Sequence, residues 1–410
     1  MDRNIHTKTG HSSYEKLLVA CCAVCFACYF GSYMRIPVVP LFARSIGADT
    51  FHVGLINSSF LLMAGLLCLP LGILSDGLGR KPLIVTGIFI TACSSFLLTL
   101  SETPDQMIGI YLLFGIGVAA FAPTLMSLVA DISPPTHLGR SYGWYTTALY
   151  GGMSLGPAAG GFVAQNMGFI PVFFYSGAFI LMILGVVFLS FPDGRSLRSS
   201  TARQQGSFML SIRELLGNYP LVACWLVTLF SCFGLGMFIT FIPLHAQDQG
   251  VSIGQIGLIF AIQALFNALS RIPFGYLSDK AAKRDKLVIA GIIGFSLSIV
   301  GLGIATGIYS FLFFAVGFGI SMGVIFTAVG ALIVELVHAD LRGLAMGGHN
   351  ACIYLGMMLS SAAMGAIIQQ VGFRNAFLIT ALINIFSACF FVAAVTYLAK
   401  TKGTRIAVKQ

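Results

Sequence analysis

Two arginines are the only charged residues that lie well inside the long apolar segments of this sequence. Arg35 and Arg271 stand among apolar neighbours, and neither has an acidic partner within these segments. A charge inside a bilayer costs about 2.5–3.5 kcal/mol or more, and it normally faces a cavity or a partner. We therefore expect both side chains to face a central cavity and to attract an anionic or zwitterionic solute. The alternative is that Arg35 extends outward, and Arg271 inward, to lipid headgroups.

Polar residues in the same segments could bind such a solute together with the arginines. The candidates are Gln263, Asn267, His349 and Asn350. His349 is also the best-placed titratable group, because imidazole titrates near neutral pH, so it is a candidate proton carrier. The alternative is a buried neutral imidazole that donates a hydrogen bond.

Carboxylates are absent from the interiors of the apolar segments. Asp131 and Glu335 lie at segment ends, where we expect them to pair with loop residues such as Arg140 and Arg342. A membrane carboxylate for proton exchange is therefore missing.

The ten cysteines all fall in apolar segments, where a disulfide framework has no role. Four of them crowd the first segment: Cys21, Cys22, Cys25 and Cys28. Three share a helical face, so a soft-metal or arsenical site is conceivable. Small polarizable side chains also permit close helix packing, which is the interpretation we prefer. We predict no metal and no cofactor.

Enzyme signatures are also absent, since the chain has no HExxH, no nucleophile elbow and no Walker loop. We therefore expect a protein that is not an enzyme.

The helices that hold these residues follow from composition. Of 410 residues 57% are hydrophobic and 9% charged, which is typical of membrane proteins. A spanning helix needs about 20 apolar residues, and continuous runs favour helices over a barrel. Twelve spans are predicted, at 17–39, 52–75, 83–100, 107–129, 142–167, 171–191, 220–245, 254–277, 287–306, 309–336, 343–371 and 375–399.

The 23 Lys and Arg residues set the expected orientation. With both termini in the cytoplasm almost all of them fall on the cytoplasmic side, as the positive-inside rule requires. We expect a plasma-membrane protein, in the inner membrane if the source is Gram-negative. The net charge of +9 then reflects topology and predicts no nucleic-acid partner.

An internal repeat relates the two halves of the chain. Between Phe30 and Asp76, 18 of 47 positions are identical to those 203 residues later, and a shift of 204 extends the match to Gly143 and Gly347. Such repeats occur in secondary carriers, with the solute site between the halves. We predict an all-α membrane protein of twelve helices in two pseudo-symmetric six-helix bundles, 1–191 and 219–410. A cytoplasmic linker with a short amphipathic helix, 192–218, joins them.

A short loop after the second span combines glycine, an acid and two bases. Its residues are Gly72, Asp76, Gly79, Arg80 and Lys81, and the repeat keeps Gly275 and Asp279. An Asp at a helix boundary can face the positive N-terminus of another helix, worth about 0.3–1 kcal/mol. We predict a conformational latch that holds the cytoplasmic side shut. A loop that serves topology alone is the alternative.

The fifth span carries a glycine-proline run, made of Gly143, Gly152, Gly156, Pro157, Gly160 and Gly161. Glycine at every fourth position makes a smooth face that another helix can approach closely. Proline removes a backbone donor and permits a bend.

The loop resembles the signature of the major facilitator superfamily. The glycine-proline run is similar, position for position, to that of its drug-efflux branch of twelve-span drug:proton antiporters. The resemblance covers essentially the whole chain. One feature differs: that branch often has an arginine four residues before a Gly-Ile-Gly run in span four, and here Tyr111 stands there.

The resemblance implies the major facilitator fold and a secondary active transporter that works by alternating access. It implies efflux of small amphipathic compounds or metabolites, coupled to protons, with a role in drug resistance. The alternative is a dedicated organic-anion or amphiphile carrier that uses Arg35 and Arg271, and a third possibility is a non-transporting receptor or lipid flippase. The expected partners are a small-molecule substrate, the proton and the lipid bilayer, and we expect a monomer.

Overall fold

The computed structural model describes residues 3–134, 136–191, 213–280, 284–338 and 341–407. Within these residues all regular structure is helical, which confirms the predicted all-α class. The helices are α1 (Arg3–Arg35), α2 (Val39–Ser45), α3 (Thr50–Leu78), α4 (Arg80–Leu98), α5 (Pro104–Ile132), α6 (Leu138–Met167), α7 (Phe169–Met182), α8 (Leu184–Ser190), α10 (Tyr219–Asp248), α11 (Ile253–Lys280), α12 (Arg284–Ile304), α13 (Gly307–Leu336) and α14 (Arg342–Ala407).

Ten helical segments of the described chain are long and apolar enough to cross a membrane. α6 is not among them, although it coincides with the fifth predicted span. α14 contains the last two predicted spans and is divided at Gly372, whose backbone (φ 77°, ψ 169°) is not helical. With α6 included and the two parts of α14 counted separately, the described helices correspond to the twelve predicted spans.

The first predicted span is interrupted by a turn at residues 36–38. Pro37 has no N–H to donate, and its ring crowds the carbonyl one helical turn earlier, which weakens the helix at this point. The Val38 N–H bonds the Arg35 carbonyl instead, at 3.0 Å. Arg35 is therefore the last residue of α1.

The chain divides into two compact units. Unit 1 comprises Met1–Asp49, Ser59–Ala202 and Ser252–Ala261, and unit 2 comprises Thr50–Ser58, Arg203–Val251 and Ile262–Gln410. The first turns of α3 thus belong to unit 2, and the first turns of α11 belong to unit 1. The linker predicted at 192–218 stays a prediction, because most of it lies outside the described residues.

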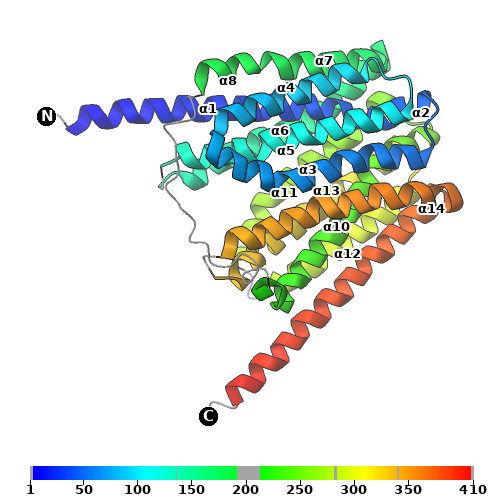
Figure 1. Ribbon diagram of the computed structural model, residues 1–410. Coiled ribbons are helices and arrows are strands. Elements are labelled where there is room, and N and C mark those ends of the chain that lie inside the picture. The colour runs from blue at the N-terminus through cyan, green and yellow to red at the C-terminus, as the bar shows by residue number, and fades with distance from the viewer. Residues whose placement is uncertain (1–2, 135, 192–212, 281–283, 339–340, 408–410) are drawn as a thin grey trace. The chain divides into compact units, whose positions relative to one another are not determined.

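The helices of the two units pack in equivalent pairs. In unit 1, α1 lies against α6, and α4 lies against α5 and α7; in unit 2, α10 lies against α14, and α12 lies against α13 and α14 (Figure 1). Single contacts repeat as well. Gly87 of α4 faces Phe121 of α5, and Gly291 of α12 faces Ile325 of α13, 204 positions later in each case. The repeat in sequence is therefore a repeat in packing.

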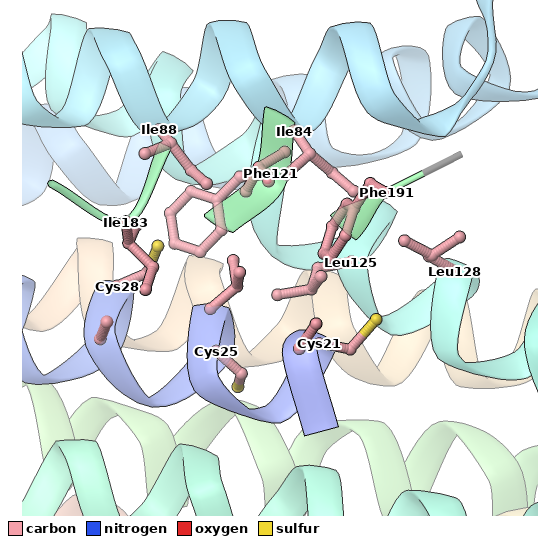
Figure 2. Packing of buried hydrophobic residues seen from close by; sticks show 14 of the residues in the cluster. Cys21, Cys25, Cys28, Ile84, Ile88, Phe121, Leu125, Leu128, Ile183 and Phe191 are labelled. Carbon is pink, nitrogen blue, oxygen red and sulfur yellow. The ribbon is translucent and has the colours of Figure 1, made fainter. Parts of the chain in front are cut away.

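The crowded cysteines of α1 lie in the hydrophobic core of unit 1. Cys21, Cys25 and Cys28 are buried among Ile, Leu and Phe side chains of α4, α5 and α8, and Figure 2 shows that their sulfur atoms do not converge on one point. In the described part of the chain no three Cys, His, Asp or Glu side chains are placed to hold a metal ion. The small thiols instead fill space between closely packed helices.

Candidate functional site

Arg271 and His349, two of the predicted solute-binding residues, lie against the same aromatic ring in unit 2. The guanidinium carbon of Arg271 is 5.8 Å from the ring centroid of Phe326 on α13. The imidazole of His349 lies 5.9 Å from that centroid, nearly perpendicular to the ring. Nε of Arg271 donates to Oδ1 of Asn267, one turn earlier on α11, at 3.1 Å. Helices α11, α13 and α14 thus assemble one polar cluster around Phe326.

Hydrogen bonding assigns a hydrogen to Nδ1 of His349. The Thr228 hydroxyl donates to the carbonyl of Cys224 at 2.9 Å, so its single hydrogen is already used. The 3.0 Å contact between Thr228 Oγ1 and His349 Nδ1 therefore needs Nδ1 as the donor. In the neutral imidazole, Nε2 then carries the lone pair and is the atom that could accept a proton.

The other two predicted neighbours of Arg271 lie apart from this cluster. Gln263 is two turns earlier on α11, and its amide contacts the sulfur of Met322 at 3.8 Å. Asn350 follows His349 in α14 but is exposed, whereas His349 is buried, because successive residues of a helix point about 100° apart. The structure therefore joins Asn267 and His349 to Arg271, and leaves Gln263 and Asn350 aside.

Arg35 lies inside unit 1 and is fully buried. Its Nη1 donates to the hydroxyls of Ser94 and Ser95 on α4, at 3.2 and 2.9 Å. Its guanidinium carbon lies 3.7 Å from the ring centroid of Phe114 on α5. The side chain thus points into the helices of its own unit and is not exposed at the surface of the structure. It therefore does not extend toward lipid headgroups, which was the alternative interpretation of the sequence.

The loop between α3 and α4 is built around Gly79 and Arg80. Gly79 stands directly before α4 with φ 96° and ψ 158°, a conformation open almost only to glycine. This turn lets Arg80 pair with Asp131 of α5, at 3.0 Å, and bond Ser75 of α3. Lys81 donates to the carbonyl of Phe188 at 3.3 Å. The two basic residues therefore tie together the ends of helices within unit 1.

The predicted latch also includes two glycines and two aspartates. Gly72 and Gly275 lie within α3 and α11, but the side chains of Asp76 and Asp279 lie outside the described residues. Their contact with a helix N-terminus stays a prediction.

The second loop forms the same ion pair with a different sequence. Arg284 Nη1 bonds Glu335 Oε1 at 2.6 Å, and both residues lie 204 positions after Arg80 and Asp131. The pairing that the sequence suggested is therefore wrong: these carboxylates bond arginines at the start of α4 and α12, and Arg140 lies 3.9 Å from Glu15 instead. The repeat offset was the signal that could have found both pairs.

Replacing Gly79 with alanine is expected to destabilise the protein by about 1–3 kcal/mol, because a Cβ is incompatible with this backbone conformation. Gly77→Ala is the matched control: Gly77 is helical, a Cβ there meets nothing within 4 Å, and alanine favours helix. Thermal unfolding of the purified protein measures both changes. Equal melting temperatures for the two variants would contradict the assigned backbone.

The glycine-proline run of α6 packs on α1. A Cβ on Gly152 would lie 2.7 Å from the Phe26 carbonyl oxygen, and one on Gly156 would lie 2.6 Å from that of Phe30. At Gly160 it would overlap the Met34 carbonyl. Gly143, at the exposed start of the run, has no neighbour within 4 Å. Three of the four spaced glycines are therefore needed for close approach.

A second side of the same run contacts the first turns of α11, which belong to unit 1. A Cβ on Gly161 would lie 2.9 Å from Cα of Gly257, and one on Gly257 would overlap the carbonyl of Pro157. Unit 2 repeats this contact with Gly54 of α3 against the carbonyl of Ser361 of α14. The second half thus keeps the close approach although it has lost the Gly-Pro sequence.

A comparison with known protein families identifies the family of this chain. The model of the Major Facilitator Superfamily matches residues 21–249 and again residues 224–409. The chain belongs to the Major Facilitator Superfamily. It is therefore a membrane transporter and not an enzyme.

Curated relatives within the Major Facilitator Superfamily include drug-resistance proteins. An uncharacterized MFS-type transporter of Methanocaldococcus jannaschii is 25% identical over 85% of this chain and 90% of its own length. The multi-drug resistance efflux pump PmrA of Streptococcus pneumoniae is 25% identical over 91% of this chain and 96% of its own. The quinolone resistance protein NorA of Staphylococcus aureus is 26% identical, over 63% of this chain and 65% of its own length.

Solved structures agree on the fold. A bacterial homolog of the human lysosomal transporter Spinster, in an inward-facing conformation, aligns with a TM-score of 0.78 over 94% of this chain and 98% of its own, at 16% identity. The nucleoside transporter NupG aligns with a TM-score of 0.78 over 92% of this chain and 99% of its own, at 14% identity. The major facilitator fold predicted from the sequence is confirmed.

Proposed function

We propose that this transporter exports small amphipathic compounds from the cytoplasm by alternating access, in exchange for protons. The similarity to PmrA and NorA, whose names record multidrug efflux and quinolone resistance, is the observation that carries this proposal. The protein would act as a monomer in the plasma membrane, with both termini in the cytoplasm.

The cluster around Phe326 suggests which compounds are preferred. Arg271 offers a guanidinium, which binds carboxylates strongly, beside a phenyl ring and the amide of Asn267. Quinolones combine a carboxylate with a flat aromatic system. We therefore expect carboxylate-bearing aromatic compounds to be better substrates than permanently cationic ones, which Arg271 would repel.

A carrier that moves an organic anion together with a proton is the second candidate. His349 and Arg271 both lie against Phe326 and interact electrostatically. A protonated imidazole is therefore repelled by the guanidinium, and a bound carboxylate would offset this repulsion. In that case the anion and the proton favour each other's binding, which is the requirement for cotransport.

Proteoliposomes with an imposed pH gradient separate the two candidates. An exchanger accumulates a quinolone when the lumen is acidic, whereas a cotransporter accumulates it when the outside is acidic. His349→Gln should remove the dependence on the gradient in either case if Nε2 is the proton acceptor. No flux of the quinolone under either gradient would overturn the export proposal.

Arg271→Gln is expected to lower quinolone transport about tenfold or more, because a hydrogen bond to a charged group is worth about 1.5–3 kcal/mol. Transport of a permanently cationic dye, such as ethidium, should not fall. Arg374→Gln, which removes an exposed arginine near Gly372, is the control for loss of charge. Quinolone transport that is equal in Arg271→Gln and the parent protein would exclude Arg271 from the substrate site.

A further inference from the structure

The guanidinium of Arg35 is only partly bonded, although it is fully buried. Nη1 donates to Ser94 and Ser95, but Nε and Nη2 have no acceptor among the described residues. These two nitrogens form the edge of the guanidinium whose N–H bonds run parallel. That edge is the fork with which arginine binds an anion through two hydrogen bonds.

A second buried donor stands one helical turn from Arg35 on α1. Ser32, one turn before Arg35 on α1, is buried and its hydroxyl has no partner among the described residues. The hydroxyls of Ser94 and Ser95 donate to the carbonyl of Thr91, at 2.8 and 3.2 Å. Only their lone pairs face Arg35. The hydrogens that remain are those of Arg35 and Ser32, and a set of donors around a positive charge selects an anion.

Arg35 makes no ion pair with a carboxylate of the described residues; Asp131 and Glu335, for example, bond Arg80 and Arg284. The ring of Phe114, 3.7 Å from the guanidinium carbon, offsets part of the cost through a cation–π interaction. A water molecule could accept one of the free hydrogens, but it would leave the charge uncompensated. A small anion would accept the free hydrogens and would also compensate the charge.

In unit 2 the positions equivalent to Arg35 and its neighbours hold aromatic residues. At the repeat offsets of 203 for α1 and 204 for α4 and α5, the counterparts of Arg35 and Phe114 are Phe238 and Phe318. Phe238 stacks on Phe318 at 4.8 Å between ring centroids. Phe295, the counterpart of Thr91, packs on the same ring at 4.4 Å. The second half thus fills this place with an aromatic stack.

The polar residues of unit 1 replace that stack as a group. Ser32 corresponds to Leu235, and Ser95 corresponds to Ile299. Four positions that are apolar in unit 2 are therefore polar in unit 1. They are Arg35 itself, Ser95, which bonds it, Thr91, whose carbonyl bonds Ser94 and Ser95, and Ser32, one turn away on α1. Helix packing alone does not require this change, since the aromatic version packs in the same fold.

We propose that unit 1 contains a binding site for a small monovalent anion, of the size of chloride or formate, held by Nε and Nη2 of Arg35 and the hydroxyl of Ser32. The complete burial of Arg35 excludes larger anions such as gluconate. The proposed site is distinct from the candidate solute site, because its residues belong to unit 1 whereas Arg271 belongs to unit 2.

Thermal unfolding of the purified full-length protein tests the proposal. The melting temperature is measured while gluconate is replaced by chloride, bromide or formate at constant ionic strength. We expect a saturable rise with each small anion. Arg35→Met should abolish the rise, and Arg271→Gln should retain it with the midpoint concentration of the parent protein.

Two further variants keep the test decisive if Arg35→Met does not fold. Arg35→Lys preserves the charge but lacks the fork, so the midpoint concentration should increase at least tenfold. Ser32→Ala should increase it several-fold. The proposal is overturned if the parent protein shows no dependence on small anions, or if Arg35→Lys keeps the original midpoint.

Discussion

Gly160→Ala is expected to destabilise this transporter by about 1–3 kcal/mol or more, the usual cost of overpacking, whereas Gly143→Ala should leave its stability unchanged. A Cβ on Gly160 would overlap the carbonyl oxygen of Met34 and lie 2.6 and 2.8 Å from its C and Cα atoms. All three are backbone atoms, so no side-chain rotation relieves the clash. Relief requires α1 to move away from α6.

Movement of α1 would also disturb neighbouring contacts. Gly152 and Gly156 rest on the same helix, and Arg35 ends it. The melting temperature of each purified variant, with transport in proteoliposomes, measures the effect. Gly143 belongs to the same run and a Cβ there would meet nothing within 4 Å. A Gly143→Ala variant as unstable as Gly160→Ala would therefore show that contact with α1 is not the cause of the loss.

The second large effect is expected at the Arg80–Asp131 pair. Arg80→Gln should cost about 3–5 kcal/mol, because it leaves the Asp131 carboxylate largely buried without its partner. The two side chains are only 14% and 20% exposed. The equivalent change Arg284→Gln should cost about 0–1 kcal/mol, because Glu335 is 55% exposed and water can solvate its charge.

Arg80 and Arg284 occupy equivalent positions of the repeat, and each bonds a carboxylate. The comparison therefore tests how the burial of the carboxylate changes the cost of losing its arginine. Melting temperatures of the single variants give the order of the effects. The double variant Arg80→Gln, Asp131→Asn should recover part of the loss, since it removes the uncompensated charge. If Arg284→Gln proves as damaging as Arg80→Gln, burial of the acid does not control the strength of these pairs.

Several features of the fold could be predicted because their causes are local. Each span needs a run of apolar residues and satisfies its own backbone hydrogen bonds, so twelve spans were visible without any tertiary contact. Pro37 and Gly372 mark places where that regularity fails. The sequence placed the break at Gly372, between the predicted spans 343–371 and 375–399. It did not place the other: the first predicted span ran through Pro37, because proline is tolerated in membrane helices.

The candidate site was only partly predictable. Arg271, Asn267 and His349 stood out as polar residues in apolar runs, but nothing in their spacing showed that α11 and α14 turn them toward Phe326. The Arg80–Asp131 and Arg284–Glu335 pairs were missed, because nearby loop arginines are closer in sequence than the arginines at the start of α4 and α12.

The amino-acid sequence by itself determined the helical class, the number of spans and the tandem repeat, since these depend on composition and on periodicity along one chain. The tertiary structure alone decided that Arg35 lies inside unit 1 on Ser94, Ser95 and Phe114, while Arg271 joins His349 in unit 2. The physical reason is helix rotation. A helix presents a side chain to every direction in turn, and only the packing of its neighbours decides which direction is a core, a partner or an open site.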